Sequence, residues 1–181
     1  MAYLNLSNAM FSGSITAQFS NLTLLKWLDI SCTYVVSDFS SLPYNLTSSL
    51  EINFGAQYGY KDGGRISLLT FNFFQGLHNL RQLVLRGVDL SEASGLTQWA
   101  NPLSFLSNLR LLQLSNYRIS SKAPTKQLLN LTNLAILKMD FNSFTSTLPN
   151  ELANLTFLSK LYLTKSNLQG PIPYLPQPKE F

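Results

Sequence analysis

The amino-acid sequence predicts an α/β repeat solenoid, with a parallel β-sheet on its concave face and loops or 3-10 turns on its convex face. Two observations predict this fold. Leucines recur at intervals of about two dozen residues along most of the 181-residue chain, and further aliphatic residues stand at fixed offsets around them. A unit of this size cannot bury its own leucines, so neighbouring units must stack and share one apolar core.

The repeat is anchored on six leucines, namely Leu4, Leu28, Leu83, Leu112, Leu137 and Leu161. Their spacing is nearly constant, except that the interval between the second and third is about twice as long as the others. Aliphatic or aromatic residues also occupy the positions two and seven residues after every anchor, and apolar residues stand three residues before it. Side chains alternate along a strand. The anchor and the residue two positions later are therefore expected to point into the core, and the residues between and beside them outward.

The last two repeats carry a more specific pattern. The segment 134–149 and the segment 158–173, which contains Gly170-Pro-Ile-Pro173, resemble the plant-type leucine-rich repeat, LxxLxLxxNxLxGxIP. The blocks 3–13 and 83–91 look more specifically like the ectodomains of plant receptor-like proteins, which lack a kinase. This resemblance implies a leucine-rich-repeat horseshoe that binds a protein or peptide ligand, acts with a co-receptor, and signals in defence or development without catalysis.

One column departs from the family pattern. The family's asparagine, five residues after the anchor, is replaced in most repeats, and the column contains Ala9, Thr33, Val88, Tyr117, Asn142 and Ser166. Alanine and valine side chains cannot form the hydrogen bonds that an asparagine amide makes to backbone groups. We expect local irregularity there, with backbone groups of the turns satisfied in another way.

The longest interval, from Leu28 to Leu83, has room for about two repeats. The segment Leu50–Phe54 can supply one extra strand. The following segment 55–64 is rich in turn-forming residues and is expected to leave the solenoid as a loop. Residues 33–76 are therefore either a degenerate repeat with a long convex loop or a ligand-gripping island. The whole chain, 1–181, is expected to be one solenoid of about seven or eight repeats.

Both ends of the sequence lack recognisable capping units. The chain starts within a repeat and ends in a proline-rich segment, 171–178, without a signal peptide or a membrane-spanning segment. We therefore expect a fragment or a truncated gene product, poorly soluble when expressed alone.

Composition argues against nucleic-acid binding and catalysis. The net charge is +4, from 13 Lys plus Arg and 9 Asp plus Glu, and the basic residues form no run. The single histidine, His78, and the single cysteine, Cys32, belong to different repeats, so they cannot form a nucleophile–base pair. His78 is expected on the surface and Cys32 as a free thiol. No cofactor or metal site is expected, because Cys32 lacks a second soft ligand nearby.

Sequons of the form Asn-x-Ser/Thr indicate candidate glycosylation sites. Asn21, Asn130 and Asn154 each stand seven residues before an anchor in the segment Asn-Leu-Thr, which places them on the convex or lateral side. Asn45 is a further candidate. Asn5 has the weakest case, because a glycan on the sheet face would block binding. Alternatively, Asn-Leu-Thr fits the turn of the repeat and carries no glycan.

Outward strand residues are the candidate ligand contacts, because successive repeats bring them side by side. The candidates are Trp27, Asp29, Gln82, Arg86, Gln113, Lys138, Asp140, Lys160 and Tyr162. The alternative for any one of them is an ordinary solvated sheet residue. Their mixed chemistry favours a peptide or protein ligand, and a short glycan remains open.

Together these features favour an extracellular recognition segment of a receptor-like protein, at the outer face of the plasma membrane or in the apoplast. The first alternative is a secreted inhibitor of a microbial wall-degrading enzyme, similar to polygalacturonase-inhibiting proteins. The second is a nonfunctional truncated copy.

Overall fold

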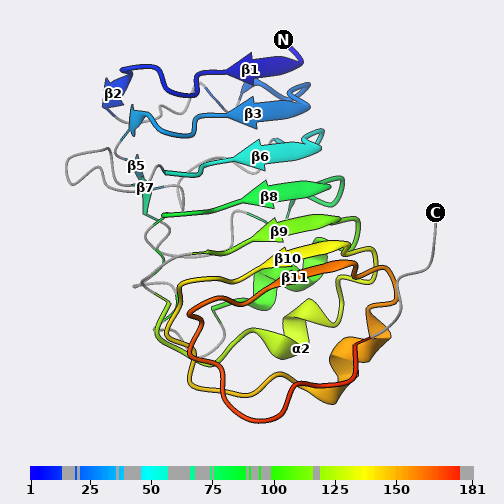
Figure 1. The fold of residues 1–181 in the computed structure, drawn as a ribbon. Coiled ribbons are helices and arrows are strands. Elements are labelled where there is room, and N and C mark those ends of the chain that lie inside the picture. The colour runs from blue at the N-terminus through cyan, green and yellow to red at the C-terminus, as the bar shows by residue number, and fades with distance from the viewer. Residues whose placement is uncertain are drawn as a thin grey trace.

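The fold is a stack of short parallel strands that form one face of a solenoid (Figure 1). The structure is a computed structural model that describes residues 1–13, 19, 21–35, 37–38, 46–56, 66–67, 74, 76–88, 90, 94, 99–115 and 119–175. Its main sheet has seven strands in sequence order: β1 (Tyr3–Asn5), β3 (Trp27–Asp29), β6 (Glu51–Asn53), β8 (Gln82–Val84), β9 (Leu111–Gln113), β10 (Ile136–Lys138) and β11 (Lys160–Tyr162). The predicted parallel solenoid is confirmed.

The register of the sheet is the one that the anchors predict. Leu4 pairs with Leu28 across β1 and β3, and the later anchors from Leu83 onward pair in the same way, each with the next. The extra strand expected within Leu50–Phe54 is β6, and its central residue Ile52 pairs with both Leu28 and Leu83. The long interval between these two leucines therefore contains one additional anchor, Ile52.

The core lies behind the sheet and is built almost wholly from these repeated aliphatic positions. The anchors Leu28, Leu83, Leu112 and Leu137 are fully buried. The first and last anchors, Leu4 and Leu161, are only partly buried against the same core. Each unit thus covers its neighbour's leucines, as a stack of repeats requires.

Short helical segments cover the core on the side away from the sheet (Figure 1). They are the 3-10 helices η4 (Asn101–Phe105) and η5 (Asn150–Asn154) and the single-turn helix α2 (Thr125–Leu128). Prolines stand at the start of all three, where a missing N–H costs nothing. Each segment buries at least one leucine, so packing rather than helix length stabilises it.

Two small parallel pairs accompany the irregular part of the chain. β2 (Ser12–Gly13) pairs with β4 (Tyr34–Val35), and β5 (Ser37–Asp38) pairs with β7 (Ile66–Ser67). At residues 55 and 56, where the loop was expected to leave the solenoid, the chain still belongs to the stack. The backbone of Gly55 and Ala56 still bonds neighbouring repeats, because Gly55 O accepts from Cys32 N and Ala56 N donates to Arg86 O. Residues 57–64 of the expected loop lie outside the described part of the chain.

The turns that follow β1, β3, β8, β10 and β11 adopt a left-handed backbone conformation at the residue four positions after the anchor. The φ angles there are 55° at Asn8, 54° at Cys32, 74° at Gly87, 56° at Phe141 and 51° at Lys165. Only one of these residues is a glycine, although glycine alone adopts this conformation without steric cost. The stacking of repeats therefore imposes the turn on the sequence.

Most positions of the family's asparagine column hold other residues. A second set of asparagines, which stand just before the strands, also forms hydrogen bonds between repeats. Asn142, the one asparagine left in the family column, is buried and donates from Nδ2 to the carbonyl oxygens of Leu114 (3.0 Å) and Met139 (3.0 Å). Four residues before the anchors, three other asparagines donate from Nδ2 to a carbonyl of the preceding repeat: Asn79 to Thr47 (2.9 Å), Asn108 to His78 (2.8 Å) and Asn133 to Ser107 (2.9 Å). The expected alternative bonding exists, and the strand register stays regular through it.

Candidate ligand-binding face

The outward side chains of the seven strands form two rows across the sheet, and the register fixes which residues are neighbours. The first row contains Tyr3, Trp27, Glu51, Gln82, Leu111, Ile136 and Lys160. The second row contains Asn5, Asp29, Asn53, Val84, Gln113, Lys138 and Tyr162. We call this surface, with the residue before and the two residues after each strand triplet, the sheet face.

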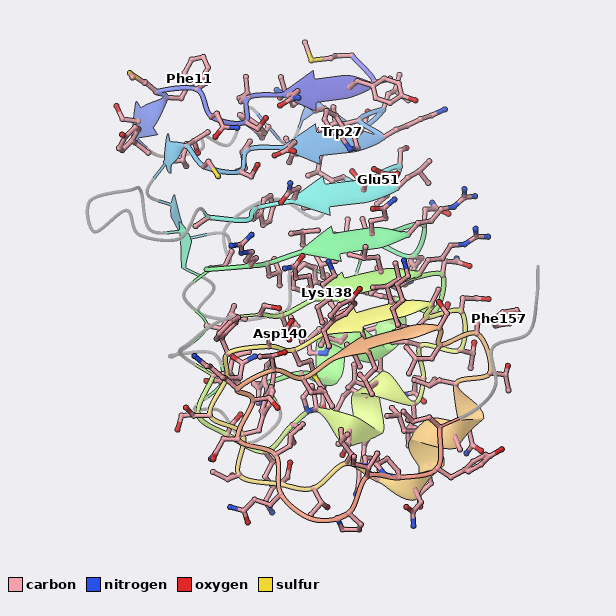
Figure 2. All side chains as sticks on the ribbon, viewed as in Figure 1. Phe11, Trp27, Glu51, Lys138, Asp140 and Phe157 are labelled. Atoms are coloured by element: carbon pink, nitrogen blue, oxygen red, sulfur yellow. The ribbon has the colours of Figure 1, made fainter. Side chains whose placement is uncertain are left out.

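The structure brings all nine predicted ligand contacts to this face. Trp27, Gln82 and Lys160 lie in the first row. Asp29, Gln113, Lys138 and Tyr162 lie in the second. Arg86 and Asp140 follow β8 and β10 by two residues, so they lie where the strands turn away. Figure 2 shows Trp27 and Glu51 on adjacent strands of the sheet and Lys138 further along the same stack.

Sequence reasoning took no ligand contact from β6, although Glu51 and Asn53 lie in the two rows. They flank Ile52 in β6, and both are half-buried like their neighbours in the rows. The signal was present in the spacing, because Ile52 follows Leu28 at the usual interval of the repeat. The sequence predicted a strand here, but Ile52 was not aligned with the leucine anchors, so its neighbours were not considered as ligand contacts.

Asp29 is held in place by two hydrogen bonds. Its Oδ1 accepts from the backbone N–H of Ser31 (2.8 Å), and its Oδ2 accepts from Nδ2 of Asn53 on the next strand (3.0 Å). Asn53 in turn accepts through Oδ1 from the N–H of Gly55 (2.9 Å). This carboxylate therefore supports the strand ends of two repeats while remaining on the sheet face.

Asn5 and Asp140 have comparable structural bonds. Asn5 Oδ1 accepts from the N–H of Ser7 (2.9 Å) and from its hydroxyl (2.7 Å). Asp140 Oδ1 accepts from the N–H of Thr164 (2.9 Å), and Oδ2 accepts from the Ser115 hydroxyl (3.3 Å). Ligand contact at these residues would therefore share side chains with the turns.

Two further contacts join neighbouring strands within the rows. Gln82 Nε2 donates to Glu51 Oε1 (3.0 Å) in the first row. In the second row, the Lys138 ammonium lies 5.2 Å from the ring centroid of Tyr162, within the range of a cation–π interaction. These contacts limit the conformational freedom of the side chains, which lowers the entropy cost of ligand binding.

The middle of the sheet face is aliphatic. Leu111 and Ile136 are direct neighbours in the first row, and Val84 lies diagonally from Leu111 in the second. All three are half-buried, although they point away from the core. Partly exposed aliphatic side chains on a sheet, with polar residues around them, are typical of protein-interaction surfaces.

The structure describes three of the four candidate sequon asparagines, and Asn21, Asn130 and Asn154 are all exposed. The leucines that follow the last two, Leu131 and Leu155, are fully buried. Asn45 lies outside the described residues. Asn5 is exposed in the second row of the sheet face.

The two residues considered for catalysis, His78 and Cys32, lie in turns of different repeats. His78 is exposed in the turn that leads toward β8, and Cys32 is a half-buried free thiol in the turn after β3. Across the described ranges, no three His, Cys, Asp or Glu residues gather in a way that would hold a metal ion. No helix in the described part of the chain is long and apolar enough to cross a bilayer.

Comparison with known proteins gives related sequences and a related fold. A family model described as Leucine Rich Repeat matches residues 133–155. The chain is 33% identical over 171 residues to Receptor-like protein 6 of Arabidopsis thaliana, and the match covers 94% of this chain and 14% of that protein. It is 28% identical over 170 residues to Receptor-like protein 41 of the same plant, and that match covers 94% of this chain and 15% of that protein. The chain thus spans about a seventh of the length of these curated relatives.

Among solved structures, the chain superposes with a TM-score of 0.76 on the Arabidopsis receptor kinase HAESA, solved in complex with the peptide hormone IDA and the co-receptor SERK1. The two are 22% identical, and the match covers 94% of this chain and 27% of that one. At this identity the likeness shows the fold, a leucine-rich-repeat solenoid.

Proposed function

Because this chain is a plant-type leucine-rich-repeat protein similar to receptor-like proteins, we propose that it is a non-catalytic recognition segment whose sheet face binds a peptide or protein ligand. The observation that carries the proposal is the sheet face itself. Seven strands hold two rows of outward side chains in fixed register, and the rows mix aromatic, aliphatic, acidic and basic groups. A rigid face with varied chemistry suits recognition by surface complementarity.

The proposed ligand is a peptide or protein, bound together with a co-receptor as a second partner. The likeness to receptor-like proteins supports this, as does the aliphatic middle of the face, which would bury apolar side chains of a ligand. Signalling in defence or development would then proceed through partners, with this chain supplying the binding surface.

The proposed location is the extracellular side of the plasma membrane or the apoplast. Accessible asparagines support it, since Asn21, Asn130 and Asn154 stand in sequons away from the sheet face. Glycans at these positions would leave the sheet face open. Glycosidase treatment of plant-expressed protein, followed by mass spectrometry, is expected to show a mass shift at each of the three. Unmodified peptides at all three sites would remove this support for a secreted location.

The binding function is tested by mapping. Peptides of eight random residues are displayed on phage and selected on the whole chain, and the recovered binders are retested on variants. Substitution of Trp27, Gln82 and Lys160 by alanine is expected to weaken binding by about tenfold or more, since a few central contacts dominate most interfaces.

The matched control replaces residues on the convex side, Lys126 and Glu151, by alanine. This control variant is expected to bind like the unmodified chain. Binders that respond to the convex substitutions and ignore the sheet-face substitutions would contradict the proposal.

A further inference from the structure

The charges on the sheet face are separated along the stack. The three N-terminal strands and their flanking residues contribute two carboxylates, Asp29 and Glu51, and one cation, Lys26. The four C-terminal strands and their flanking residues contribute one carboxylate, Asp140, and five cations. These cations are Arg81, Arg86, Arg110, Lys138 and Lys160. The face therefore changes from weakly acidic to strongly basic between β6 and β8.

The acidic end also carries an aromatic ring. Trp27 pairs with Glu51 in the first row, and Asp29 lies two residues after Trp27 on the same strand. A cationic side chain placed there meets two carboxylates and the face or edge of an indole, a combination that favours lysine or arginine. Figure 2 shows Trp27 and Glu51 on adjacent strands.

The basic end gathers cations around the first row. Lys160 is exposed in β11, and Lys138 lies on the neighbouring strand β10. Arg81 and Arg110 are exposed next to each other at the start of β8 and β9, where Arg110 N donates to Arg81 O (2.7 Å). Like charges at adjacent rungs repel each other, and an anionic partner relieves that repulsion.

The aliphatic zone lies on β8–β10, between the acidic strands and Lys160 of β11. Leu111 and Ile136 occupy the strands β9 and β10, and Val84 occupies β8. Strands in a sheet are about 4.8 Å apart, so β6 is about 14 Å from β10 and about 19 Å from β11 along the stack. An extended peptide spans these distances with about four to six residues at roughly 3.3 Å each.

We propose that the sheet face binds an extended peptide segment that carries a basic residue and an acidic residue about four to six positions apart, with apolar residues between them. The basic residue lies over Trp27, Asp29 and Glu51. The acidic residue lies among the cations of β8–β11, and the apolar residues cover Leu111 and Ile136. This inference rests on the proposed function and adds to it the ligand's chemistry and its placement along the stack.

The experiment is a selection on defined variants of the whole chain. Random eight-residue peptides displayed on phage are selected in parallel on the unmodified chain, on Glu51→Lys, and on the double variant Lys138→Glu with Lys160→Glu. Peptides recovered on the unmodified chain are expected to be enriched in pairs of a base and an acid with the stated spacing. Circular dichroism checks that each variant keeps its fold.

Each variant is expected to lose the enrichment of only one of the two charged peptide residues. Glu51→Lys is expected to reduce the enrichment of the basic residue about tenfold, and the double variant is expected to reduce the enrichment of the acidic residue by a similar factor. Both effects are expected to shrink as salt is raised, because exposed charges are screened. The control variants Glu151→Lys and Lys126→Glu change the same charges on the convex side and are expected to leave both enrichments unchanged.

The possible outcomes separate the two proposals. Binders that map to the sheet face without paired charges overturn this inference and leave the proposed function standing. Binders that map elsewhere overturn both. Equal losses in the convex controls would mean that net charge, and not the arrangement on the sheet face, selects the peptides, which also overturns the inference.

Discussion

The turns after β8 and β10 share a left-handed backbone position, but they have different residues at that position and at the next one. After β8 the left-handed position is Gly87 and the next residue is the buried Val88. After β10 the left-handed position is Phe141 and the next residue is the buried Asn142. The first turn avoids backbone strain but has no side-chain amide, and the second accepts the strain and adds hydrogen bonds. A solenoid turn can thus be stabilised in two ways.

The asparagines that stand four residues before the anchors explain why the β8 turn tolerates the lack of a side-chain amide. Asn79 and Asn108 join the repeats on either side of the β8 turn through bonds to Thr47 O and His78 O. Contact between repeats is therefore kept, although the side chain of Val88 offers only apolar packing there. The comparison teaches that the stack needs bonds between repeats but does not need them at a fixed position.

The largest effect is expected when Asn142 is replaced by the valine of the other turn. Asn142→Val leaves the carbonyls of Leu114 and Met139 without their side-chain donor, and burying an unpaired polar group costs about 1–3 kcal/mol. The loss is moderated because Asn142 Oδ1 has no hydrogen-bond partner among the described residues, so its removal costs nothing. Urea unfolding is expected to show a destabilisation of about 2 kcal/mol.

The reciprocal change, Val88→Asn, is the control for that variant. If the two turns are alternative solutions on one backbone path, an amide at residue 88 finds equivalent carbonyls and costs less than about 1 kcal/mol. A larger loss from Val88→Asn than from Asn142→Val would show that the two turns are not equivalent.

The next effect concerns the glycine of the β8 turn. Gly87→Ala places a Cβ in a left-handed conformation and 3.0 Å from the Cβ of Ala56 in the preceding repeat. The expected destabilisation is about 1–2 kcal/mol, measured as a shift of the urea midpoint. Gly13→Ala is the matched control, because its φ is also positive while no atom lies within 4 Å of the added Cβ. Equal losses in both variants would mean that backbone conformation alone, and not the contact with Ala56, sets the cost.

A smaller effect is expected at the asparagines that stand four residues before the anchors. Asn108→Ala removes one exposed bond between repeats, from Nδ2 to His78 O (2.8 Å), and is expected to cost about 0.5–1.5 kcal/mol. The unfolding midpoint is compared with that of Asn150→Ala, an exposed asparagine at the start of η5. A cost at residue 108 no greater than at residue 150 would mean that this second set of asparagines contributes nothing to the stack.

The smallest effect is a gain. Lys165 is exposed and has a φ of 51°, so Lys165→Gly relieves strain at that position, but it also removes the contact of the Lys165 ammonium with the Phe141 ring (5.8 Å to the centroid). The relief outweighs this exposed contact and the greater chain entropy of glycine, and a net stabilisation of about 0.5 kcal/mol is expected. Lys160→Gly, in the neighbouring strand β11, is expected to destabilise because glycine weakens strands. Thermal unfolding of the two variants in opposite directions would confirm the strain, and a loss at both would refute it.

Much of the sheet face was predictable, and the errors have a physical origin. The nine predicted contacts reach one face because strand alternation and repeat spacing are local rules that the sequence displays directly. Glu51 and Asn53 were missed because Ile52 replaces the leucine on which the alignment depended. The first two residues of the expected loop, Gly55 and Ala56, stay in the stack because their backbone groups bond Cys32 and Arg86 in the repeats on either side. No local pattern reveals such partners.

By itself, the sequence determined the inward half of this protein: which side chains form the core, and which strand positions pair. These features follow from burial, because apolar side chains are removed from water and aliphatic residues at a regular spacing therefore mark the core positions. Only the tertiary structure decided how residues of successive repeats bond to one another and which backbone conformation their turns adopt. The bond from Asn53 to Asp29 and the left-handed turns at Cys32, Phe141 and Lys165 arise because stacking places residues of successive repeats against one another at a fixed separation.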